Sequence, residues 1–186
     1  VYPLFANALR NKNGQSIEEH MQDTGELFES FSKVASKNEY AWFPTHRSAA
    51  EIAEVKPENR MIGLPYTKYM NSIMRVNQSC AMVMMSAKKA RALGIPESKW
   101  IFLYSGSCVN DIWNVSNRID YCSSPAIKAC TDGVLNLANI SVDQIDFIDL
   151  YSCFPSAVQI AMKELSLKKD DPRGLTVTGG LPYFGG

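Results

Sequence analysis

The sequence has little of what several classes of protein require. Basic and acidic residues number 19 each, so the formal net charge is zero and the basic field typical of a nucleic-acid-binding protein is missing. No apolar run approaches the roughly 20 residues that span a bilayer. We therefore expect no nucleic-acid partner and no membrane-spanning helix.

Histidine and closely spaced cysteine pairs are also scarce. The chain has only two histidines, His20 and His46, and its five cysteines form no C-x-x-C pair. This composition argues against a zinc site and against a disulfide framework, so we predict no metal. Free cysteines fit a reducing compartment, and we expect a cytoplasmic protein.

Residues 1–75 are predicted to form a helical, loop-rich lead-in. Capping boxes of the form S-x-x-E at 16–19 and 48–51 mark two helix starts. We expect Gly25 to divide the first helical stretch in two, and we interpret residues 61–75 as loop.

Residues 76–186 are predicted to form an α/β domain. Helices are expected after Ser86 and from Pro125 and Pro155, because serine caps helices and proline favours their first position. Short apolar runs between them are typical of buried strands, at 81–85, 100–104, 145–150 and 175–178. The order is β-α-β-α-β-α-β, which indicates an α/β layer arrangement. We interpret Asp146 and Asp149 as the solvated face of the third strand.

Both ends of the sequence suggest a piece of a longer protein. The chain starts at Val1 without methionine, and it stops at Gly185-Gly186 within a glycine-rich stretch. We expect the domain 76–186 to be truncated at its end.

One stretch resembles a known family. Tyr151-Ser152-Cys153-Phe154 stands between a strand and a helix, and the following strand ends in Thr178-Gly179-Gly180. Thiolases carry NEAF at this junction, the sterol-carrier-protein type carries HDCF, and a G-G turn leading to G-H-P follows. Segments 19–25, 31–38 and 76–81 are similar to sterol-carrier-type thiolases in the same order, and "NRMIGLPYTKYMN" resembles bacterial thiolase-like acetyl-CoA acetyltransferases.

The resemblance implies a fold and an activity. The fold would be the C-terminal half of a thiolase, a mixed sheet with helices packed on it, preceded by a loop-domain-like segment. The activity would be acyl transfer to or from coenzyme A, with the nucleophilic cysteine upstream of Val1. Acyl-CoA would be the substrate, no cofactor would be bound covalently, and subunits would pair as homodimers through sheet edges.

The resemblance also assigns catalytic motif positions. Tyr151 stands at the asparagine of the motif, Ser152 at its acidic position and Cys153 at a position that is not the nucleophile. Gly186 falls where the histidine of G-H-P stands in thiolases.

Substrate-binding positions follow in the same way. Phe154 matches the phenylalanine that borders the pantetheine tunnel in thiolases. From the residues themselves, Thr178, Gly179 and Gly180 fit a cradle of backbone N–H groups for a thioester carbonyl, a tight turn that needs glycine, or both.

Three functions compete at this stage. The motif order favours an acyl-CoA acyltransferase, whereas glycine at position 186 and tyrosine at 151 favour an inactive acyl-CoA-binding or structural module. A cysteine hydrolase built on Cys153 lacks an identifiable His–Asp arrangement. We interpret Cys153 as a packed, unreactive thiol, since reactivity would require a lowered pKa from a nearby cation or helix N-terminus.

Overall fold

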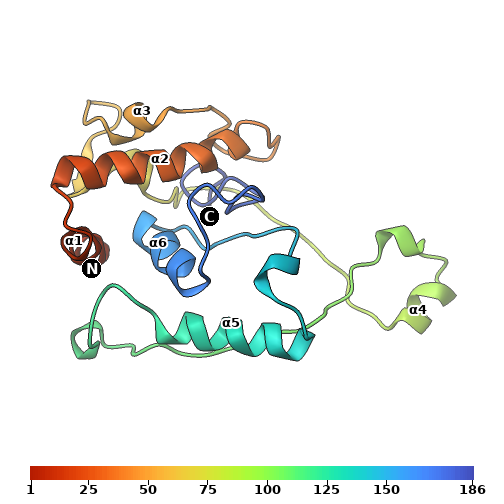
Figure 1. Ribbon diagram of the computed structural model, residues 1–186. Coiled ribbons are helices and arrows are strands. Elements are labelled where there is room, and N and C mark those ends of the chain that lie inside the picture. The colour runs from red at the N-terminus through yellow and green to blue at the C-terminus, as the bar shows by residue number, and fades with distance from the viewer.

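The computed structural model describes residues 1–186 as six α-helices, a two-stranded sheet and four short 3₁₀ turns (Figure 1). The α-helices are α1 (Tyr2–Lys12), α2 (Ile17–Ala35), α3 (Ala49–Ala53), α4 (Ala87–Ala92), α5 (Pro125–Ala138) and α6 (Pro155–Glu164). The strands are β1 (Met61–Gly63) and β2 (Tyr66–Thr67), and the 3₁₀ turns are η1 (Lys68–Met70), η2 (Glu97–Lys99), η3 (Val115–Asn117) and η4 (Val142–Gln144). Helix α6 lies between α2 and α5, and α4 sits on a segment that projects from the body (Figure 1). No helix combines the length and the apolar character needed to cross a bilayer.

The predicted helix starts are confirmed. The Ser16 hydroxyl accepts a hydrogen bond from the Glu19 N–H, and the Glu19 carboxylate accepts one from the Ser16 N–H, as a capping box requires. Ser48 begins α3 in the same way, Ser86 caps α4, and α5 and α6 start at their prolines.

The predicted division at Gly25 is wrong, because α2 continues through it as one helix of 19 residues. A Cβ atom at Gly25 would lie 2.5 Å from the carbonyl oxygen of Ala49. The glycine is therefore needed for the close approach of α2 and α3, and not for a helix break.

Asn59 terminates α3 from inside the protein. Its side-chain N–H₂ donates to the carbonyls of Glu51, Ile52 and Glu54 at 3.1, 3.0 and 2.8 Å. Its side-chain oxygen accepts from the Tyr69 N–H at 2.8 Å. Fully buried, Asn59 thus satisfies the carbonyls that the end of a helix leaves unpaired.

One cluster of 14 buried residues forms the main core. It combines Phe28 and Phe31 of α2 with Val158 of α6, Ile148 before α6 and Tyr183 near the chain end. Both predicted segments, 1–75 and 76–186, contribute to this core, and their division into two domains stays a prediction.

The four predicted strands do not form a sheet within this chain. Residues 81–85, 100–104, 145–150 and 175–178 carry no ladder, although a backbone hydrogen bond of 3.0 Å joins the Leu150 N–H to the Leu175 carbonyl. The small antiparallel sheet, β1 with β2, lies instead in the stretch predicted as loop. An apolar run shows that a segment can be buried, but a strand also needs a neighbour for its backbone groups.

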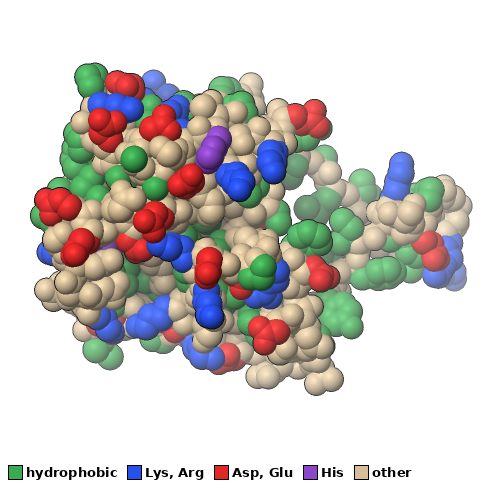
Figure 2. Space-filling model, turned by 45° about the horizontal axis from the view of Figure 1, so that its top comes forward, with side chains coloured by type: hydrophobic (Ala, Val, Ile, Leu, Met, Phe, Trp, Pro, Cys, Tyr) green, Lys and Arg blue, Asp and Glu red, His purple; other side chains and the backbone are tan.

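The first two of these runs belong to an exposed segment, residues 76–112, which we call the arm. Ile101 is 92% exposed and Phe102 is 70% exposed. Figure 2 shows apolar side chains where the arm joins the body and charges of both signs spread over the body.

Candidate functional site

The two motifs singled out in the sequence meet at Ser152. Its hydroxyl accepts a hydrogen bond of 3.0 Å from the Leu181 N–H, and the side chain is only 1% exposed. A Cβ at Gly180 would lie 2.5 Å from the Ser152 oxygen and 2.6 Å from the Phe31 ring. Residues 151–154 and 178–181 therefore form one structural unit, which we call the motif junction.

Thr176 organises the second half of the motif junction. Its hydroxyl donates to the Asp149 carboxylate at 2.8 Å and accepts from the Gly179 N–H at 3.1 Å and the Thr178 N–H at 3.3 Å. The Asp149 carboxylate also accepts from the Val177 N–H at 3.3 Å. Asp149 is exposed, as predicted, but it also fixes the turn through Thr176.

Backbone geometry explains the two glycines of the turn. Gly179 and Gly180 have φ of +106° and +72°, values that favour glycine. Their N–H groups donate to the hydroxyls of Thr176 and Thr178. These donors are thus used inside the turn, so the observed geometry is that of a tight turn and not of an open cradle for a carbonyl.

Cys153 lies beside this turn as a buried thiol. The side chain is 8% exposed, and burial raises the pKa of the thiol above its ordinary value of 9.0. The neighbouring Cys153 in turn raises the pKa of Tyr151, whose side chain is 71% exposed. His20 faces Gln15 and His46 faces Glu29, so neither histidine is paired with the thiol.

Phe154 contacts aromatic residues near both ends of the 1–75 segment. Its ring stacks on Tyr2 with centroids 3.7 Å apart, and on Tyr66 at 5.7 Å. The Tyr66 hydroxyl accepts a hydrogen bond from the Ser156 N–H, and burial raises the pKa of Tyr66 to about 12. Tyr66 therefore stays neutral and holds the start of α6 against β2.

Gly186 lies at the end of a loop that packs against the lead-in. Its N–H donates to the Ile73 carbonyl at 3.3 Å, and the carbonyls of Tyr183 and Phe184 accept from the N–H groups of Phe43 and Trp42. The position offers backbone groups and no imidazole, and it lies in the loop that follows the glycine turn.

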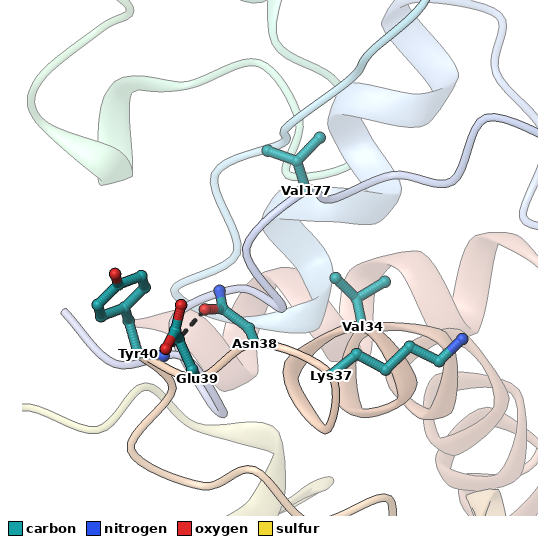
Figure 3. A pocket seen from close by; sticks show the side chains of 6 residues that line it. All are labelled: Val34, Lys37, Asn38, Glu39, Tyr40 and Val177. Carbon is teal, nitrogen blue, oxygen red and sulfur yellow. Dashed lines mark hydrogen bonds between the residues drawn. The ribbon is translucent and has the colours of Figure 1, made fainter.

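A wide hollow of about 630 Å³ borders the motif junction near the end of α2 (Figure 3). Figure 3 shows Asn38 and its neighbours from the end of α2 on one side and Val177 on the other. The Asn38 amide donates to the Thr178 carbonyl at 3.0 Å, and its oxygen accepts from the Tyr40 N–H. The Asn38 bond thus joins the rim of the hollow to the start of the glycine turn, whose two glycines are themselves buried.

A smaller cavity of about 460 Å³ lies near Phe154, between the start of α1, residues 111–118 and the starts of α5 and α6. Tyr2 belongs both to its wall and to the stack on Phe154.

Sequence reasoning missed three residues that build the site: Asp149, Asn38 and Tyr2. Asp149 carries a weak signal, because it lies two residues before the motif, on the predicted strand that leads into it. Asn38 and Tyr2 act across 140 and 152 residues of sequence, so spacing alone gives no sign of them.

Comparison with known proteins places this geometry in context. Over its full length, the chain superposes on a monomeric SCP2-thiolase-like protein type 1 from Mycobacterium smegmatis, with a TM-score of 0.91 and 43% sequence identity. It is 22% identical over 177 residues to an acetyl-CoA acetyltransferase from Methanocaldococcus jannaschii. An Ltp2–ChsH2(DUF35) aldolase shares the fold, with a TM-score of 0.70 over 99% of the chain at 14% identity. No established family profile matches the chain.

The chain covers only part of each of these proteins. It spans 40% of the mycobacterial protein, 43% of the archaeal acetyltransferase and 50% of the aldolase chain.

The fold and the motif junction together define an α/β protein of the thiolase superfamily, and the chain belongs to that superfamily. Within it, the chain is SCP2-thiolase-like. The predicted α/β class and thiolase-like fold are confirmed, with helices dominant and the sheet small.

Proposed function

We propose that this chain is part of a cytoplasmic acyltransferase that moves acyl groups to or from coenzyme A. The observation that carries the proposal is the hydrogen bond between Ser152 and Leu181, which joins the two motif segments into one site. The archaeal acetyl-CoA acetyltransferase, similar over 95% of this chain, supports the same chemistry.

In this proposal the nucleophile comes from outside the chain. A catalytic cysteine needs a stabilised thiolate, whereas burial raises the pKa of Cys153 and no histidine is paired with it. In the proposal Cys153 is a packed thiol without a catalytic role, whereas Tyr151 is exposed and can contact the substrate.

Coenzyme A is the expected substrate and no covalently bound cofactor is needed. In the proposal, Phe154, Thr178 and the glycine turn form one wall of the CoA site. The wide hollow beside Val177 supports this assignment, because Asn38, which lines it, is hydrogen-bonded to the Thr178 carbonyl.

A second function, acyl-CoA binding without turnover, is favoured by one specific feature. Gly186 stands at the position where thiolases carry the histidine that activates the nucleophile, and glycine has no group to accept a proton. If no other base replaces it, the protein binds acyl-CoA and leaves it unchanged.

One assay separates the two functions. The full-length protein is mixed with acetoacetyl-CoA and CoA, and loss of the magnesium-enolate absorbance is followed. Turnover supports the acyltransferase, and saturable CoA binding without turnover supports the binding module. Absence of both overturns the proposal.

The assignment of Cys153 is tested by alkylation with iodoacetamide. We expect the exposed Cys80 and Cys108 to react first and Cys153 to stay protected until the protein unfolds. A Cys153→Ala variant is expected to retain any acyl transfer. Rapid modification of Cys153 near neutral pH would contradict the assignment.

The predicted homodimer remains to be measured. Sedimentation of the full-length protein decides between a dimer and a monomer, which is the state of the similar mycobacterial protein.

A further inference from the structure

The end of the arm lies along one face of α5 (Figure 1). The Ser105 hydroxyl donates to the Val134 carbonyl at 3.0 Å, and the Cys130 thiol donates to the Ser107 carbonyl at 3.2 Å. A Cβ atom at Gly133 would lie 3.1 Å from the side-chain oxygen of Ser107, so the glycine leaves room for this approach. Three contacts thus hold the end of the arm against the helix.

These contacts bring two free cysteines close together. Cys108 directly follows Ser107 and is exposed, and Cys130 is half-buried on α5. A carbonyl oxygen lies about 3 Å from the next α-carbon, so the Cys130 sulfur is at most about 6 Å from the α-carbon of Cys108. A disulfide needs α-carbons about 4.4–6.8 Å apart, so rotation of the two side chains and a small shift of the exposed arm suffice to form one.

The other three cysteines do not share this arrangement. Cys122 and Cys153 are buried. Cys80 is as exposed as the first cysteine of the pair and also belongs to the arm, but Gln78, two residues before it, donates to the Phe184 carbonyl and not to α5. Access to solvent and a neighbouring thiol therefore coincide at one pair only.

We propose that Cys108 and Cys130 form a reversible disulfide that fastens the arm to α5 when the protein meets a hydroperoxide. In a reducing compartment disulfides are usually transient and redox-sensing, so a pair that opens again fits the expected location. The inference concerns these thiols alone and does not depend on the proposed function.

The reaction takes place in two steps. The exposed Cys108 sulfur attacks the peroxide, the O–O bond breaks, and a sulfenic acid and one water (or alcohol) are formed. The Cys130 sulfur then attacks the sulfenic sulfur, so that the S–S bond forms, the S–O bond breaks, and the hydroxyl leaves as water with the Cys130 proton. The two thiols lose two electrons, which reduce the peroxide, and a thiol reductant reverses the link by exchange.

The test uses the full-length protein and hydrogen peroxide. After oxidation, free thiols are blocked with iodoacetamide, and a digest without reductant is analysed by mass spectrometry. We expect a linked peptide that contains Cys108 and Cys130, and dithiothreitol should remove it. Absence of this peptide, or equal yields of Cys130 linked to Cys80 or to any other cysteine, would overturn the inference.

Three variants assign the two roles. Cys130→Ser removes the attacking thiol of the second step, so the sulfenic acid on Cys108 should persist, and its adduct with dimedone should rise at least fivefold over wild type. Cys108→Ser should abolish the linked peptide and give no such adduct. The matched control, Cys80→Ser, changes the other exposed cysteine of the arm and should leave the yield of linked peptide unchanged. An unchanged dimedone adduct in Cys130→Ser would show that the two thiols do not react with each other.

Hydrogen exchange measures the effect on the arm. In the oxidised protein, amide exchange at residues 105–107 should slow at least fivefold relative to the reduced protein, because the link restricts opening of this segment. Exchange in α2, far from the pair in sequence, should stay the same. Equal exchange at residues 105–107 in both states would mean that the disulfide does not fasten the arm.

Discussion

Two regions of this protein have similarly apolar sequences, but one is buried and the other is exposed. Around α2 and α3, Phe28, Phe31 and Ile52 are completely buried. In the arm, Ile101 and Phe102 are 92% and 70% exposed, although the sequence around them is as apolar. Burial is thus decided by the partners that a segment finds, and not by its composition alone.

Polar side chains mark the difference between the two regions. The buried Asn59 side chain makes four hydrogen bonds, three of them to carbonyls at the end of α3, and Thr67 adds a hydroxyl donor to the Ile52 carbonyl at 2.7 Å. The apolar runs of the arm, residues 81–85 and 100–104, have no such contacts from the body. The packed region is held by specific bonds at its element ends, which is why its boundaries follow from sequence.

The largest expected effect separates the two regions directly. Phe28→Ala should lower the free energy of unfolding by about 3–5 kcal/mol, since it leaves a cavity in the core. Phe102→Ala, in the arm, should change it by less than about 0.5 kcal/mol. Urea denaturation of both variants gives the values, and equal losses would mean that the arm is covered in the protein.

Asn59→Ala comes next in magnitude. The substitution leaves three carbonyls and the Tyr69 N–H without their partner, so we expect a loss of about 2–4 kcal/mol. Asn136→Ala on the exposed face of α5 is the control and should stay within about 0.5 kcal/mol. A loss below about 1 kcal/mol for Asn59→Ala would show that water replaces the amide.

Gly25→Ala tests the close approach of α2 and α3. The new methyl would meet the Ala49 carbonyl at 2.5 Å, and the strain should cost about 1–3 kcal/mol. At Gly133 of α5, the nearest atom is a side-chain oxygen of Ser107 at 3.1 Å, in the arm. Gly133→Ala should therefore be neutral or stabilising by up to about 1 kcal/mol, and thermal unfolding of both variants decides the point.

His20 gives the smallest effect, which depends on pH. Burial lowers its pKa below 6.5 in the folded protein, whereas in the unfolded chain it keeps a value of about 6.5. The unfolded state then binds more protons in acid, so stability is complete above about pH 6.5 and falls as the pH decreases. Unfolding of wild type and His20→Gln from pH 5 to 8 should show a smaller acid loss in the variant, whereas His46→Gln, an exposed control, keeps the loss. Identical profiles for wild type and His20→Gln would exclude this role.

The sequence predicted the helices well because their ends carry local signals. Ser16, Ser48 and Ser124 each bond a backbone N–H three residues ahead, a pattern that is visible in a window of four residues. Gly25 was misread because its reason lies across space, at Ala49. The prediction of four paired strands was wrong for the same reason. A β-ladder needs a neighbouring strand, and the local sequence does not show which segment that neighbour is.

For the site, the order of motifs predicted which segments matter but not how they are joined. Tyr151 to Phe154 and Thr178 to Gly180 were identified from their resemblance to thiolases, and the structure brings them together through Ser152. The hydrogen bond from Asn38 and the ring stack from Tyr2 come from distant parts of the chain, so the spacing of residues in the sequence does not predict them.

Gly180 has a left-handed backbone conformation, and the Ser152 oxygen and the Phe31 ring leave no room for a side chain. These two constraints limit which changes its codon can tolerate. Every glycine codon begins with two guanines, so a change in either of those bases introduces a side chain or stops translation. Among natural variants of this gene, we expect codon 180 to drift in its third base alone.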